Sequence, residues 1–266
     1  MKLATTISTP MFTRAIVRPP APNFADGLTT VDLGPPDYRR ALKQHEDYCA
    51  ALERCGLTLI RLAADPRYPD STFVEDTAVL ANQRAVLTRP GASSRTGEVA
   101  NIRDALADFY PSTLSINSPA TLDGGDVCEA GNHFFIGISE RTNEAGAHQL
   151  AEFVAPLGYT ASFVDIRRLK TILHLKSGIA SLGDSRLVVI DALANHRNFS
   201  KYDLVRVNDD EMYGANCVRV NDRVLVAAGF PVLEGKLREL EYQTIALDMT
   251  EFQKMDGGLS CLSLRF

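Results

Sequence analysis

Three residues that lie far apart in the sequence could together form a nucleophilic site: Cys261, His174 and Asp123. A cysteine attacks as its thiolate, and a neighbouring histidine can generate or stabilise that thiolate. A carboxylate can orient the histidine or bind a cationic substrate. Cys261 comes shortly after Asp256-Gly257-Gly258, whose glycines allow a tight turn and a close approach to a ligand. These residue types predict covalent catalysis on sulfur if the fold brings them together.

Two adjacent acids, Glu75 and Asp76, interrupt the apolar stretch 73–80, which its pattern predicts to be a strand. A buried and unpaired carboxylate would cost several kcal/mol, so these acids must face solvent, an internal cation or a ligand. Asp123 belongs to a second acidic segment, 123–126, which contains no P-loop lysine and has no EF-hand spacing. We therefore expect no metal site.

A recurring unit supplies the elements that must position these residues. An apolar stretch, a polar turn, a second apolar stretch and a helical pattern recur about every 40 to 50 residues. Helices are predicted over residues 38–55, 94–106, 143–153 and 233–240. Residues 14–18, closed by the C-terminal tail, would form a fifth copy. The alternative is an α+β sandwich with unrelated hairpins.

Polar residues interrupt the first apolar stretch at matching places in these units. They are Glu75-Asp76, Asp123, His174 and Asn216, with Cys261 in the last unit. Radial repetition of the units would make these positions converge on one axis. Alone, a histidine within residues 172–177 is more typical of a buried core and a terminal cysteine is more typically inert, so the prediction depends on this convergence.

The bulk properties exclude several classes of protein. The chain has 266 residues, which fit one domain, and its net charge of −5 argues against nucleic-acid binding. No apolar run is long enough for a membrane span, and no secretion signal is evident at the N-terminus. The five scattered cysteines predict reduced thiols and a cytoplasmic location. Residues 19–36, rich in Pro, Gly, Asn and Asp, predict a long loop that serves as a lid or as a plain connector.

The motifs around these residues resemble the dimethylargininases (dimethylarginine dimethylaminohydrolases). This family belongs to the guanidino-group-modifying superfamily, with the arginine deiminases and amidinotransferases. The resemblance covers nearly the whole chain and rests on five motifs in order: Phe73-Val74-Glu75-Asp76, Leu122-Asp123-Gly124-Gly125-Asp126, Leu173-His174-Leu175-Lys176-Ser177, Gly214-Ala215-Asn216-Cys217 and Met255-Asp256-Gly257-Gly258-Leu259-Ser260-Cys261.

The resemblance implies an α/β fold, a five-bladed propeller of pseudo-fivefold ββαβ-type repeats that forms a single domain over residues 1–266. It implies Cys261 as nucleophile, His174 as general acid and base, and Asp123 as the carboxylate beside the histidine. Many bacterial relatives have glutamate at the position of Asp123. The remaining implied contacts are Asp70, Glu75, Asp76 and the Met255 backbone to the guanidine, Arg95 and Arg141 to the amino-acid carboxylate, Leu28 on the lid, and Asp256 beside the sulfur.

The implied reaction is hydrolysis of Nω-methylated L-arginine to citrulline and a methylamine through a covalent thiouronium, with no cofactor. The substrate is a small cationic amino acid, and a homodimer is expected. Within the superfamily, arginine deimination, citrulline hydrolysis or amidino transfer remain alternatives. A non-catalytic arginine-binding relative is a further alternative, although such a protein need not retain the cysteine, the histidine and the acid together.

Overall fold

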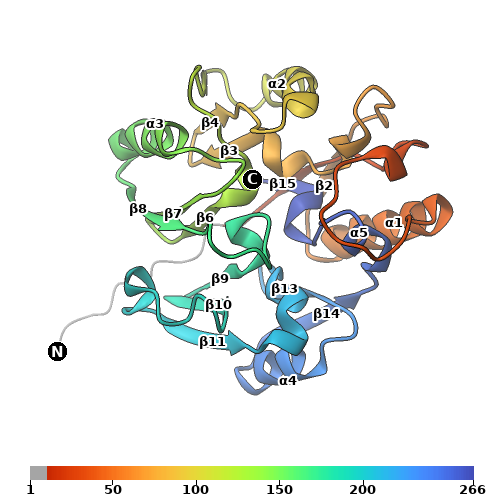
Figure 1. Ribbon diagram of the computed structural model, residues 1–266, viewed down its shortest axis with the longest axis vertical. Helices are drawn as coiled ribbons and strands as arrows, with labels where there is room; N and C mark the ends of the chain where they lie inside the picture. Colours follow the sequence, from red (N-terminus) through yellow and green to blue (C-terminus); the bar gives the residue numbers. More distant parts are fainter. Residues whose placement is uncertain (1–10) are drawn as a thin grey trace.

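Each sequence repeat forms one three-stranded sheet, and the five sheets surround a common centre (Figure 1). The computed structural model describes residues 11–266. From the inner to the outer strand, the sheets are β15 (Ser263–Arg265), β1 (Arg14–Val17) and β2 (Thr58–Arg61); β3 (Ala78–Ala81), β4 (Arg84–Leu87) and β5 (Thr113–Ser115); β6 (Val127–Ala130), β7 (His133–Ile138) and β8 (Thr160–Asp165); β9 (Ile179–Gly183), β10 (Arg186–Ile190) and β11 (Asp203–Val207); β12 (Val218–Val220), β13 (Arg223–Ala227) and β14 (Gln243–Leu247).

In every sheet the middle strand pairs antiparallel with the inner strand and parallel with the outer one. A parallel neighbour requires a crossover connection, which a helix supplies in four of the five repeats. These helices are α1 (Tyr38–Arg54), α2 (Val99–Leu106), α3 (Glu144–Val154) and α4 (Pro231–Glu239), and a short helix α5 (Thr250–Gln253) follows β14. The predicted ββαβ propeller is confirmed, and C-terminal β15 closes the first sheet as expected.

The outer helices cover the sheets because each has one apolar face. In α1, Ala41, Tyr48 and Leu52 are spaced for one side of a helix and are fully buried. Asp37 caps its first turn by accepting a hydrogen bond from the Arg40 amide at 2.8 Å. The repeat built on β9 has no such helix. A 3-10 turn at 197–199 takes its place, with Phe199 buried in the core.

A 3-10 helix precedes each inner strand with no more than two residues between them, and this common feature positions the site. These turns are η3 (Val74–Thr77), η5 (Gly124–Asp126), η7 (Leu175–Ser177), η9 (Asp209–Ala215) and η10 (Ser260–Leu262). The prediction of a strand over residues 73–80 is therefore wrong in its first half, because the strand begins only at Ala78. Turn geometry lets the adjacent acids in η3 reach separate polar partners while both are buried.

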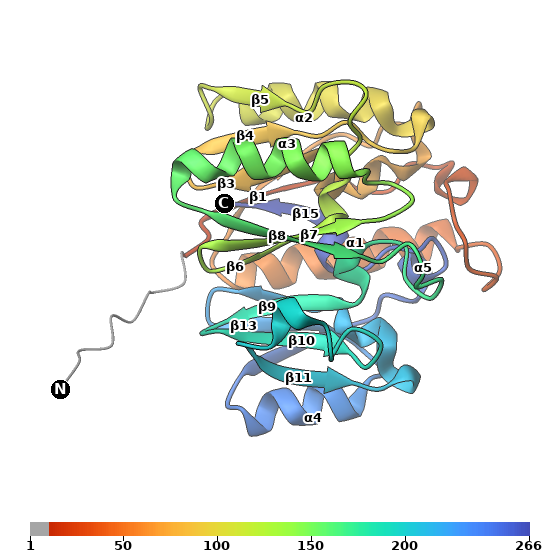
Figure 2. The same cartoon turned by 60° about the vertical axis from the view of Figure 1, so that its left-hand side comes forward.

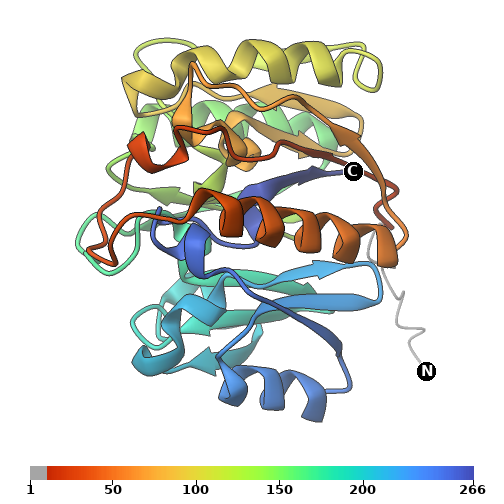
Figure 3. The same cartoon turned by 90° about the vertical axis from the view of Figure 1, so that its right-hand side faces the viewer.

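The loop before α1 lies at the opposite end of the molecule from the chain end at Phe266 (Figures 2 and 3). Within this loop Phe24 is fully buried against the rings of Phe73 and Phe252, whereas residues 28–34 are exposed. Among residues 11–266, none of the helices is both long and apolar enough to cross a bilayer. The prediction that no secretion signal is present rests in part on residues 1–10, which lie outside the described range.

Candidate active site

The 3-10 turns surround a cavity of about 30 Å³. All but two of the residues predicted for the site line it. The lining residues are Leu28, Asp70, Phe73, Asp76, Arg95, Arg141, Leu173, His174, Met255, Asp256, Gly257 and Cys261. The two exceptions are Asp123 and Glu75. Cys261 and His174 thus face one cavity although they come from different repeats.

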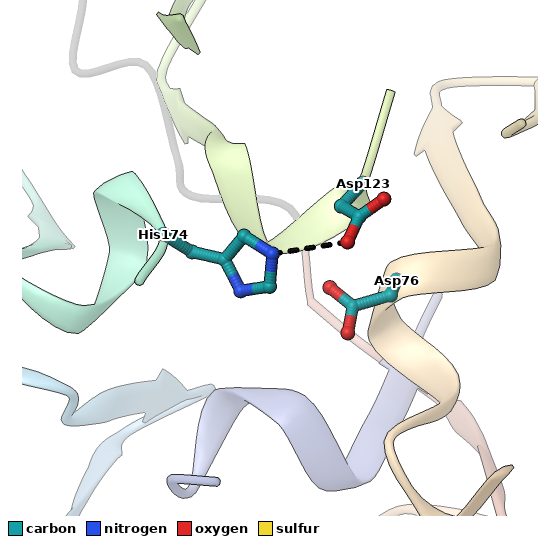
Figure 4. A group of neighbouring side chains, drawn as sticks. All are labelled: Asp76, Asp123 and His174. Carbon is teal, nitrogen blue, oxygen red and sulfur yellow. Dashed lines mark hydrogen bonds and ion pairs between the residues drawn. The ribbon is translucent and has the colours of Figure 1, made fainter. Parts of the chain in front are cut away.

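His174 is held by a buried carboxylate behind it. Its Nε2 lies 3.0 Å from Oδ2 of Asp123, and Asp76 lies beside the pair (Figure 4). The other oxygen of Asp123 accepts the Gly91 amide at 2.8 Å, which fixes the carboxylate. A Cβ at Gly125 would lie 2.8 Å from Nδ1 of His174, so only glycine lets the imidazole pack this closely.

The charge around His174 favours the imidazolium. Burial lowers the pKa of His174, but the negative charges of Asp76, Asp126 and Asp123 outweigh it and raise that pKa to about 9. The histidine is therefore mainly protonated at neutral pH. A protonated imidazole beside a sulfur is suited to donate a proton to a leaving group.

The Cys261 sulfur lies in the same negative environment, which disfavours its thiolate. Burial raises the pKa of Cys261, and the carboxylates of Glu75 and Asp76 raise it further, to about 12. The backbone of Gly258 and the Lys176 ammonium lower it to a smaller extent. Without a bound cation, the sulfur is consequently a thiol at neutral pH.

Arg95 holds Asp76 in place. Its guanidinium is buried, pairs with Asp76 at 2.6 Å and with Glu98 at 2.8 Å, and donates to the carbonyl of Phe73 at 3.1 Å. This geometry does not support the expectation that Arg95 binds a substrate carboxylate, because its main donors already have protein partners. Arg141 differs. Among the described residues, no hydrogen bond or ion pair joins its guanidinium to a protein group, and it faces the cavity.

Glu75 faces away from the small cavity. One of its oxygens accepts the Ser260 hydroxyl at 2.6 Å, and the other pairs with Lys176 and, at 3.4 Å, with Arg265. It lines a separate cavity of about 910 Å³ at the hairpin ends of the inner strands. The expectation that Glu75 contacts a guanidine is therefore not supported by this arrangement.

Two carboxylates hold the loop at 19–36 over the cavity. The Leu28 amide donates to Oδ1 of Asp70 at 3.0 Å. The amide of Thr30 donates to Asp256 at 2.5 Å, and its hydroxyl donates to the other oxygen of Asp256 at 3.1 Å. Asp256, expected beside the sulfur, thus lines the cavity while its carboxylate binds the loop.

One group of side chains has the composition of a metal site. Ligand atoms of Asp76, Asp123 and His174 lie within 4.8 Å of one another. Each carboxylate oxygen already has a partner, since Asp76 accepts from Arg95 and from the Gly125 amide, and Asp123 accepts from the Gly91 amide and His174. The group is built as a hydrogen-bonded acid–imidazole cluster.

Known proteins of similar sequence cover nearly the whole chain, although no family model matches it. The N(G),N(G)-dimethylarginine dimethylaminohydrolase of Pseudomonas aeruginosa is 41% identical over 257 residues, which are 96% of this chain and 100% of that protein. The protein of the same name from Streptomyces coelicolor is 35% identical, over 95% of this chain and 96% of its own length.

Solved structures share the fold of the chain. The Pseudomonas aeruginosa enzyme with one cysteine replaced by serine, in complex with citrulline, superposes with a TM-score of 0.93 at 40% identity, covering 96% of this chain and all of that one. The N-terminal domain of a cyanobacterial arginine dihydrolase, at 20% identity and a TM-score of 0.82, shares the fold over 95% of this chain and 96% of its own.

Proposed function

Because the chain belongs to the dimethylarginine dimethylaminohydrolase family, we propose that it hydrolyses Nω-methylated L-arginine to L-citrulline and di- or monomethylamine. One observation carries the proposal: Cys261 and the His174–Asp123 pair meet at a cavity lined by buried carboxylates. A thiol and an imidazolium supply a nucleophile and an acid. The carboxylates suit a cationic substrate.

The guanidinium binds against the carboxylates of Asp70 and Asp76, both of which are buried at the cavity. A carboxylate matches the donor fork of a guanidinium with charge-assisted hydrogen bonds. Arg141 pairs with the α-carboxylate of the substrate, since its guanidinium faces the cavity. The backbone of Met255, which also lines the cavity, completes the contacts to the guanidinium.

The bound cation changes the protonation of Cys261. The negative charges that raise the pKa of the thiol are neutralised by the guanidinium, so that pKa falls, the thiol releases its proton to solvent and the thiolate forms. The thiolate attacks the central guanidinium carbon and a C–S bond forms. His174 donates its proton to the methylated nitrogen, the C–N bond breaks, and a neutral amine leaves.

The second half of the reaction uses the same histidine as a base. Neutral His174 takes a proton from water, and the oxygen attacks the carbon of the thiouronium. Collapse of this adduct breaks the C–S bond and passes the hydroxyl proton to the departing sulfur, which returns the Cys261 thiol and leaves the neutral ureido group of citrulline. The proton retained on His174 is ready for the next cycle. Asp123 stabilises the imidazolium and fixes its orientation throughout.

The loop at 19–36 must open for substrate to enter. A cavity of about 30 Å³ is close to the space that one water molecule occupies, and is far smaller than an arginine side chain. The hydrogen bonds from Leu28 to Asp70 and from Thr30 to Asp256 are among those that opening breaks. The loop is therefore a lid, and its closure excludes bulk water from the thiouronium.

A panel of substrates tests the proposal. Reduced, folded protein is assayed for ureido product and for released amine with asymmetric dimethylarginine, monomethylarginine, arginine and citrulline. We expect turnover of the two methylated arginines. Preference for unmethylated arginine would limit the result to a related guanidine hydrolase. No turnover of any of the four would contradict the enzymatic proposal and favour an arginine-binding role.

We also infer a reducing, cytoplasmic location and a homodimer. All five cysteines are free, which supports a reducing compartment. Light scattering on the purified protein measures the assembly directly. A mass near 29.1 kDa would identify a monomer and contradict the dimer.

A further inference from the structure

Asn216 connects the turn that carries the cysteine to the turn that carries the histidine. It is buried at the end of η9. Its Oδ1 accepts the backbone amide of Ser260 at 2.9 Å, and its Nδ2 donates to the carbonyl of Lys176 at 2.8 Å. Ser260 directly precedes Cys261, and Lys176 follows His174 by two residues. One amide therefore joins the two turns.

The same two turns are joined a second time through Glu75. The Ser260 hydroxyl lies 3.1 Å from Nδ2 of Asn216 and donates to Glu75 at 2.6 Å, and the Lys176 ammonium pairs with the other oxygen of Glu75. Asn216, Ser260, Glu75 and Lys176 form a closed ring contributed by four different repeats. We call it the supporting ring.

The backbone of the cysteine turn packs directly on Asn216. A Cβ at Gly258 would lie 2.5 Å from Oδ1 of Asn216. Glycine at this position therefore lets the backbone reach the amide. Since the Gly258 carbonyl also accepts the backbone amide of Cys261 at 3.2 Å, the contact extends to the backbone of the cysteine itself.

We propose that Asn216 is a positioning residue that fixes the Cys261 sulfur relative to the His174 imidazole, an inference that rests on the proposed function. Sulfur and imidazole belong to different repeats, so their relative position depends on noncovalent contacts between the turns. Asn216 touches neither reacting group. A displacement of about 1 Å in such a pair can lower the rate by about 10²-fold.

Asn221 offers a matched control at the other end of β12. Its Oδ1 accepts the Phe12 amide at 2.8 Å, and its Nδ2 donates to the carbonyls of Phe12 and Cys55 at 3.0 and 2.8 Å. It also joins two distant segments through one amide, but away from the small cavity. Its left-handed backbone, with φ of 56°, adds a cost when alanine replaces it. Asn221→Ala is thus expected to lose at least as much stability as Asn216→Ala.

The experiment compares Asn216→Ala, the nearly isosteric Asn216→Asp and Asn221→Ala at matched concentrations of folded protein. Turnover of dimethylarginine gives kcat and KM, and thermal unfolding gives stability. We expect kcat to fall by about 10- to 100-fold in both Asn216 variants. KM should stay within about threefold, because the groups that bind substrate are untouched. Asn221→Ala should lose stability but keep both constants.

The outcomes separate positioning from simple support of the fold. If Asn216→Ala and Asn221→Ala lose stability alike and both keep wild-type kcat, the inference is overturned. Failure of both Asn216 variants to fold, while Asn221→Ala folds, would also overturn it by assigning a purely structural role. If the wild-type protein itself turns over none of the methylated arginines, the proposed function fails instead.

Discussion

The two ends of the central axis differ in size and in chemistry. The cavity at the 3-10 turns has a volume of about 30 Å³ and is lined by Cys261 and His174. The cavity at the hairpin ends has a volume of about 910 Å³ and is lined by Glu75, Lys176 and Ser260 among others. No residue lines both cavities. The large cavity is also lined by residues of the inner strands.

Near neighbours in the sequence face opposite cavities. Asp76 faces the small one and Glu75 the large one; Cys261 faces the small one and Ser260 the large one. Choosing the candidate active site by cavity volume alone would select the large cavity, which lacks the cysteine and the histidine. The small cavity contains a nucleophile, an imidazolium and a free guanidinium, whereas the groups of the large one form the ion pairs and hydrogen bonds that support it. The comparison teaches that η3 and η10 each divide their residues between reaction and support.

Replacing one cysteine at each cavity gives the largest expected difference. Cys261→Ser should lower turnover by about 10⁴-fold or more, because an alcohol beside an imidazolium is a far weaker nucleophile than a thiolate. Cys217→Ala, on the side of the large cavity, should keep turnover near the wild-type value. Product formation and circular dichroism measure both variants. Retained activity in Cys261→Ser would contradict sulfur as the nucleophile.

Asp123→Asn tests the carboxylate behind His174. General acid–base catalysis contributes about 10²- to 10⁴-fold, and we expect a loss of kcat within that range. The pH profile gives a second measurement. Because the pKa of His174 is raised to about 9, activity that needs the imidazolium should decline as pH rises through about 9. Asp123 is one of the causes of this rise, so the decline should move to lower pH in the variant. An unmoved decline would contradict the assignment of the acid to His174.

Arg141→Ala tests substrate binding in the small cavity. Loss of a charge-assisted contact to the α-carboxylate should raise KM by about 10- to 100-fold, with a smaller change in kcat. Arg219→Ala is the control, since Arg219 lines the large cavity and donates to protein groups at Asp184 and Asn221. Steady-state kinetics on both variants measures the difference. Equal KM values would sink the assignment of Arg141.

The repeats were predictable because their hairpins have local signals. Asn82, Asp184 and Asn221 occupy left-handed positions at the predicted polar turns, a conformation that short polar side chains tolerate. The convergence of Cys261, His174 and Asp123 was predicted because these residues occupy matching positions in repeats arranged around one axis. The recurrence of apolar stretches and polar turns gave the length of the repeat, and each stretch and turn is a local property of the chain.

The cavity that each acid faces was not predictable from pattern. A strand over 73–80 and a 3-10 turn both place Glu75 and Asp76 in different directions, but only the turn sends Glu75 to Lys176, a residue 101 positions away. The partners of Arg95 and the loop contact of Asp256 likewise depend on contacts between repeats. The sequence singled out Asn216 because it interrupts the first apolar stretch of its repeat. Its two hydrogen-bond partners, the Ser260 amide and the Lys176 carbonyl, became evident only in the structure.

Glu75→Gln should have the smallest effect on turnover. It is the sharpest test of the division of η3 between a residue that faces the small cavity and one that faces the large cavity. The amide can still accept the Ser260 hydroxyl, so KM should stay within about threefold, whereas Asp70→Asn, in the small cavity, should raise KM by about tenfold. Lys176 and Arg265 would lose their charged partner, which should lower the stability of the variant by about 2 kcal/mol.

Since the charge of Glu75 raises the pKa of Cys261, the Glu75→Gln substitution lowers that pKa. Iodoacetamide should then alkylate Cys261 faster at pH 8 than in the wild-type protein. A tenfold rise in KM in Glu75→Gln would instead place this carboxylate on the guanidinium and end the distinction between the two faces of η3.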